Sequence, residues 1–128
     1  MKLTDCDAAF YGESALPPGT NGLPEGRKER RGLGVTFWCP LCVKANLPLH
    51  RRAMLPIAFA QPLDGGPPQE GWRTAGGELR HRHHWQRTGD TLETLTLSPS
   101  INAEGEKHDH GPGWHGHILD GQCVGGGL

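Results

Sequence analysis

Glycine and proline recur along the whole chain and restrict what it can fold into. The 20 glycines and 11 prolines make up about a quarter of the 128 residues, and only 34% of the residues are apolar. Because ordering each residue costs roughly 1–2 kcal/mol, the small core that this composition allows needs help from a metal, disulfides or a partner. We therefore expect one small domain with such an additional source of stability.

Because glycine and proline interrupt the chain so often, short β-strands are the elements that we expect. Residues 33–38 are β-branched and aromatic, residues 54–62 form a second apolar run, and residues 78–87 and 95–97 flank a Thr-Gly-Asp-Thr turn as neighbouring strands. Residues 115–124 predict a hairpin, because Asp120-Gly121 suits a two-residue type I′ turn. No stretch predicts a capped helix of three turns. The expected fold is mainly β, a small antiparallel sheet or zinc-ribbon-like domain.

The N-terminal part has a different composition. Residues 1–34 are predicted to form an extended arm, which is richest in proline and glycine from Tyr11 to Gly34. It is either disordered or ordered by lying on a partner. Residues 35–123 then form the β domain, and residues 124–128 a flexible tail.

Charge is distributed unevenly although the net formal charge is only −1. Residues 27–87 hold eleven Lys/Arg against four acids, whereas residues 88–128 hold one lysine against six acids. This polarity fits head-to-tail packing of copies, a nucleic-acid surface, or simply a solvated face. The candidate partner-binding residues are Arg27, Lys28, Arg30, Arg31, Arg80, Arg82 and Trp85.

The strongest local motif is Cys39-Pro40-Leu41-Cys42. Two thiolates at this spacing can chelate zinc from a tight turn, and zinc asks for four N or S ligands. The histidines of residues 108–117 and Cys123 could supply the rest. A redox dithiol and ordinary buried cysteines are the alternatives. No signal peptide or membrane span is present, so we expect a reducing cytoplasm.

Enzyme motifs are weak. The chain has no Gly-x-Ser-x-Gly elbow, no His-Glu-x-x-His and no phosphate-binding glycine loop. A zinc hydrolase would have to use His110, His115 or His117 with Asp109 or Asp120. The sequence therefore favours a non-enzymatic protein.

Several motifs occur in order between residues 37 and 123. They are the Cys-Pro-x-Cys turn, a Trp-x-x-x-Gly-Asp-Thr block followed by Leu-Thr-Leu-Ser-Pro-Ser-Ile, and a late Trp-His-Gly-x-Ile-x-x-Gly. In this combination the chain resembles a family of small proteins of unknown function from tailed bacteriophages and prophages. The resemblance implies a phage protein that is present in the host cytoplasm during infection.

The resemblance also implies a ligand set. It carries Cys39, Cys42 and His115 over as metal ligands, while the family's usual cysteine three residues before the late histidine is Pro112 here. The fourth ligand is open among His110, His117 and Cys123, and we favour His110 for its proximity.

The function expected from these features is a structural or accessory role in the virion, such as capsid decoration or head completion. Its partners would be phage structural proteins or copies of the chain itself, and its cofactor one structural Zn²⁺. The alternative from another class is an early phage effector that binds nucleic acid or a host protein through Arg80, Arg82, His83, His84 and Trp85.

Overall fold

The computed structural model describes residues 1–104, 107–108 and 111–128, and these residues form a mainly β structure, as predicted. A five-stranded sheet has the order β1-β2-β3-β6-β7, and a three-stranded sheet has the order β12-β11-β8. The strands of the five-stranded sheet are β1 (Ala9–Glu13), β2 (Arg30–Trp38), β3 (Met54–Phe59), β6 (His84–Thr88) and β7 (Thr96–Ser98). Those of the three-stranded sheet are β8 (Ile101–Asn102), β11 (His115–Leu119) and β12 (Gln122–Val124).

The remaining elements are short. Two small hairpins are formed by β4 (Trp72–Arg73) with β5 (Leu79–Arg80) and by β9 (Lys107–His108) with β10 (Gly111–Pro112). The helices are η1 (Leu3–Cys6), η2 (Thr20–Gly22), α1 (Pro40–Lys44) and η3 (Leu49–Arg51). As expected, no helix of three turns occurs among the described residues. No helix in this part of the chain is long and apolar enough to cross a membrane.

The predicted strands are largely where the sequence placed them. Residues 33–38 lie in β2, residues 54–59 form β3, and β6 pairs antiparallel with β7 across the predicted turn. The segment 78–87 is divided, however, because Leu79–Arg80 pairs with β4 and the longer strand starts only at His84. The main sheet is mixed, since β3 and β6 run parallel over Ala58–Phe59.

The hairpin at residues 115–124 forms as predicted. Asp120 and Gly121 have φ angles of 49° and 71°, which is the left-handed pair that a type I′ turn requires. Gly116 lies on the core side of β11, where an added Cβ would collide with the Trp114 indole and the Val124 carbonyl. A glycine here therefore lets the Trp114 ring and the end of β12 both approach β11 closely.

The core lies between the two sheets at one end of the molecule. Phe37 of β2 and Trp114, which precedes β11, are fully buried and meet edge to face with ring centroids 6.3 Å apart. The Trp114 Nε1–H donates to Gly125 O at 3.1 Å, so its polar end is satisfied. All four cysteines belong to this core.

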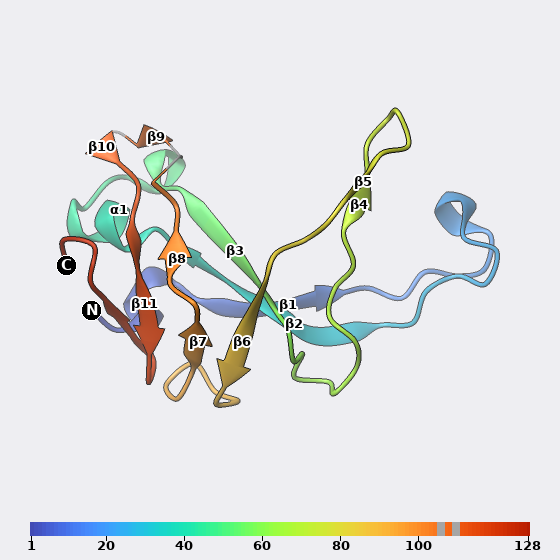
Figure 1. Cartoon of the computed structure of the whole chain (residues 1–128), viewed down its shortest axis with the longest axis horizontal. Helices are drawn as coiled ribbons and strands as arrows, with labels where there is room; N and C mark the ends of the chain where they lie inside the picture. Colours follow the sequence, from blue (N-terminus) through green and yellow to red (C-terminus); the bar gives the residue numbers. More distant parts are fainter. Residues whose placement is uncertain (105–106, 109–110) are drawn as a thin grey trace.

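The N-terminal segment divides into two parts. Residues 1–8 join the body, because Leu3 and Cys6 of η1 are buried in the core and Leu3 N donates to Gly121 O at 2.8 Å. Residues 14–29, which we call the arm, extend the β1–β2 hairpin. Figure 1 shows η2, at the tip of the arm, at the opposite end of the long axis from both chain ends.

Candidate functional site

The Cys39–Cys42 turn forms a compact knuckle at the end of β2. Cys39 precedes α1, Pro40 occupies its first position, and both cysteines are fully buried. The Cys39 backbone is tied to Ala53, with Cys39 N donating to Ala53 O at 2.8 Å. Strand β2 and the start of β3 therefore hold the two sulfurs together.

The two thiols interact with each other. Burial raises the pKa of Cys42 to about 11, and a hydrogen bond to the Cys39 sulfur adds to this rise. The Ala53 N–H donates to the Cys42 sulfur and acts in the opposite direction, because it stabilises a thiolate. A buried thiol pair with a backbone N–H donor suits a soft metal cation, which would replace the two protons.

The predicted histidine ligands are not all brought to this pair. Among the described residues no three His, Cys, Asp or Glu side chains form a group that could hold a metal, so Cys39, Cys42 and His115 do not form one. His115 lies on the exposed face of β11, where its Nε2 is 3.1 Å from Ser100 Oγ and its Nδ1 is 3.5 Å from Glu104 Oε1. His110, the favoured fourth ligand, lies outside the described residues, and so does Asp109.

The zinc site therefore stays a prediction. The knuckle has the donor chemistry of half a site, and the β9–β10 hairpin of the histidine-rich stretch lies at the end of the molecule that also holds α1 (Figure 1). The other proposed residues are spread out: His117 shares the exposed face of β11 with His115, and Asp120 sits in the type I′ turn. Among the described residues, His115, His117 and Asp120 therefore do not form a group that could hold a metal.

A second cysteine pair was not predicted. Cys6 of η1 and Cys123 of β12 are buried at 0% and 1% exposure, and their thiols hydrogen-bond to each other. The bond from Cys123 lowers the pKa of Cys6 and raises that of Cys123. The only sequence signal was the spacing of Leu3 and Cys6, which places both on one face of a helical turn.

The arm is held by its own cross-strand bonds. Leu16 N donates to Arg27 O and Arg27 N to Leu16 O, both at 2.8 Å. The Arg27 side chain donates to Ser14 O at 3.2 Å and lies 3.6 Å from Glu13. At the base, Arg30 binds both oxygens of Asp64 at 2.9 and 3.0 Å.

The predicted partner-binding cations thus fall into two groups. Arg27 and Arg30 hold the arm and its base, whereas Lys28 is exposed and Arg31 is exposed beside Glu29. Arg80 pairs with Glu78 at 3.3 Å on the β4–β5 hairpin. Lys28 of the arm and Arg31 at the start of β2 are therefore the cations of this region most open to a partner.

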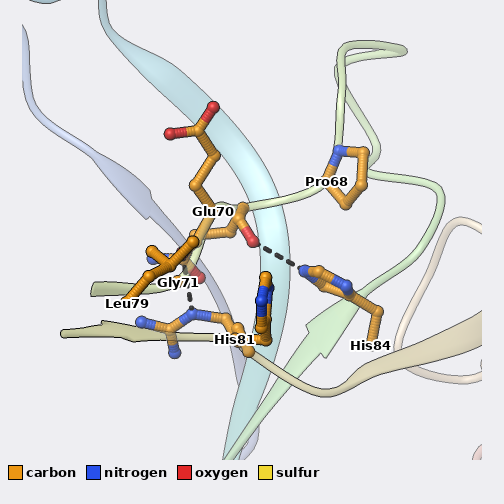
Figure 2. Close-up of a pocket in the computed structure, with 8 residues that line it drawn as sticks. Pro68, Glu70, Gly71, Leu79, His81 and His84 are labelled. Atoms are coloured by element: carbon orange, nitrogen blue, oxygen red, sulfur yellow. Dashed lines mark hydrogen bonds between the residues drawn. The ribbon is translucent and has the colours of Figure 1, made fainter. Parts of the chain in front are cut away.

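The histidine-rich segment before β6 lines a cavity of about 540 Å³. Figure 2 shows His81 and His84 in it, with the Glu70 carboxylate pointing away from both rings. The His84 Nε2–H donates to Gln69 O at 2.6 Å, and Arg82 donates to Glu70 O at 3.3 Å. These side chains join the loop of residues 68–71 to the start of β6 and to the segment that precedes it.

Trp85 packs against the core. Its Nε1–H is 3.4 Å from Ser100 O, and the His83 ring meets it edge to face at 4.4 Å. With its indole engaged in this way, Trp85 offers a nucleic-acid base less free surface than the sequence suggested.

Comparison with known proteins gives no further assignment. No protein-family model, no curated protein and no solved structure matches this chain. The function is therefore argued from the geometry and the sequence motifs.

Proposed function

We propose that this chain is a non-enzymatic accessory protein of a tailed phage, acting through contacts with its own copies or a larger particle. Capsid decoration and head completion are the roles that fit best. The observation that carries the proposal is the arm, an ordered hairpin that reaches away from the body to the far end of the molecule (Figure 1).

An arm that is already ordered is well suited to binding. Its paired strands lose less conformational freedom on association than a disordered tail would, so more of the contact energy appears as affinity. The tip exposes Leu23, at 39% exposure, among prolines and glycines. We infer that this apolar tip inserts into a neighbouring subunit.

The exposed cations near the arm favour a partner whose docking surface is acidic. Lys28 of the arm and Arg31 just after it are exposed, and the acids of the described part of residues 88–128 (Asp90, Glu93, Glu104 and Asp120) lie outside the arm. The basic residues 27–87 and the acidic residues 88–128 could attract each other in contacts between copies. A particle surface rich in carboxylates could also bind Lys28 and Arg31.

The proposal includes one structural Zn²⁺ on Cys39 and Cys42. His110 and His115 remain the proposed further ligands, with His117 and Cys123 as the alternatives for the fourth position. The ion would cross-link the end of β2 to the later part of the chain and stabilise a small core. For His115 to bind, its contacts with Ser100 and Glu104 would have to open.

The decisive experiment is mass spectrometry of purified particles of the phage or prophage that encodes this chain. We expect the chain in stoichiometric amounts. Its absence from particles would contradict the proposal.

A shortened arm tests the arm itself. In this variant residues 16–27 are replaced by Asn-Gly, which closes the hairpin with a type I′ turn. We expect the variant to fold and to be lost from particles. The matched control is Leu119→Ala, which removes an exposed leucine of β11 far from the arm and should be incorporated normally. Equal incorporation of the shortened variant would refute the role of the arm.

A further inference from the structure

Two segments from opposite ends of the sequence form a pair in the body. Cys123 N donates to Met1 O at 2.7 Å, Leu3 N donates to Gly121 O at 2.8 Å, and Lys2 bridges to Gln122. The first residues thus extend the three-stranded sheet beyond β12. This pairing fixes where η1 begins.

Helix η1 then turns Cys6 back toward β12. Its Sγ lies 3.6 Å from Met1 Sδ, and its thiol is in hydrogen-bond contact with that of Cys123. Both cysteines are buried in the core, with no water-exposed surface on Cys6. The backbone hydrogen bonds of Met1 and Leu3 and the packing of both cysteines in the core keep the two side chains near each other.

We propose that Cys6 and Cys123 are a disulfide site that locks the first residues to β12. The proposal rests on this geometry and not on the phage role. The two thiols already interact, and backbone bonds hold residues 1–3 beside Gly121–Cys123, so a disulfide requires the two side chains to approach without a new arrangement of the chain.

The oxidant is a small-molecule disulfide such as glutathione disulfide, admitted when residues 1–3 open transiently. One protein thiol gives its proton to water and attacks the oxidant, forming a mixed disulfide and releasing one glutathione thiolate. The other protein thiol loses its proton and attacks the mixed disulfide, releasing the second glutathione thiolate. Two protons and two electrons leave the protein, and one disulfide is reduced to two thiols.

The Cys39–Cys42 pair is the competing site. A disulfide there would close a loop of only a few residues, whereas Cys6–Cys123 closes nearly the whole chain. The unfolded chain loses more conformational freedom when a longer loop is closed, so the Cys6–Cys123 disulfide stabilises the folded state more than a Cys39–Cys42 disulfide would. The two sites therefore differ in a measurable way.

The test uses the full-length wild-type protein under native conditions. The reduced protein is incubated with glutathione disulfide, its remaining thiols are blocked with N-ethylmaleimide, and linked peptides are mapped by mass spectrometry. We expect Cys6 joined to Cys123 and a rise in Tm of about 10–20 °C over the reduced protein. Four blocked cysteines, or a Cys39–Cys42 link beside blocked Cys6 and Cys123, would overturn the proposal.

Two variants separate the pairs. Cys39→Ser with Cys42→Ser should still gain the Cys6–Cys123 link and the rise in Tm. Cys123→Ser should show no rise on oxidation, and a rise of the same size would overturn the proposal. If either variant fails to fold, the peptide map of the wild-type protein still decides.

Discussion

The body and the arm are stabilised in different ways. In the body, strands from both sheets bury Phe37, Trp114 and the four cysteines around one core. In the arm, the bonds between Leu16 and Arg27 are local and its tip is exposed. The body therefore depends on apolar burial, and the arm on hairpin pairing and the polar contacts of Arg27.

This difference explains how a glycine-rich chain can have both a fold and a long extension. The limited apolar content is concentrated where the sheets meet, so the arm can be polar and exposed without weakening the core. It also means that changes in the two regions should differ in their effect on stability.

The largest effect is expected from Trp114→Ala. Removal of this fully buried indole should cost about 3–5 kcal/mol of unfolding free energy, because it leaves a cavity against Phe37. Urea denaturation measures it. Leu119→Ala on the adjoining β11–β12 hairpin is the control and should change stability by about 0.5 kcal/mol or less. Similar midpoints for the two variants would remove the distinction between core and surface.

Metal removal should have the next largest effect. If Zn²⁺ binds the knuckle, holding free zinc at about 100 times its Kd stabilises the body by about 2.7 kcal/mol over chelated protein. Elemental analysis of tag-free protein and melting with and without a chelator test this. Cys39→Ser should lose both the zinc and the response to the chelator. If the purified protein contains no zinc and its Tm is the same with and without the chelator, the proposed zinc site is excluded.

A smaller effect is expected at the base of the arm. Hydrogen bonds from Arg30 and from the Gly66 N–H lower the pKa of Asp64 to about 2. Because the folded pKa lies below the unfolded value, this stabilisation is present above about pH 4 and is lost as the pH falls through 2.

Asp64→Asn should therefore flatten the fall in stability between pH 4 and 2. Unfolding midpoints across this range measure the change. Glu29→Gln, which breaks only the exposed pair with Arg31, is the control and should keep the wild-type profile. An unchanged profile in Asp64→Asn would show that Arg30 does not fix the arm to residues 61–66.

The smallest effect is expected in the arm. Replacing residues 16–27 by Asn-Gly should change the unfolding free energy of the body by about 0.5 kcal/mol or less, since no core residue is removed. Hydrogen exchange gives the complementary result: the Leu16 and Arg27 amides should exchange far faster than that of Cys39. Equal protection would mean that arm and body open as one unit.

The sequence predicted the parts of the fold that local chemistry determines. Strand β2 follows from its β-branched and aromatic residues, and the β11–β12 hairpin from Asp120-Gly121. The same local reasoning assigned residues 1–8 to the arm together with the proline- and glycine-rich stretch from Tyr11 to Gly34 that follows them. Their burial depends on pairing with β12, a contact across nearly the whole chain that no short pattern contains.

The candidate site shows the same limit. The spacing of Cys39 and Cys42 predicted their proximity, since three residues span one turn. The strand alternation that put His115 and His117 on one face also turned that face toward solvent, which the motif alone did not reveal. A sequence-based prediction of this site therefore lacked two things: which distant segments pair, and which face of β11 is buried.

Because the arm is an excursion between two adjacent antiparallel strands, its two roots stay at hairpin spacing whatever segment joins them. Its length can thus change without disturbing the sheet. The arm is a natural place to graft a foreign peptide, which the folded body would then present at its distal end.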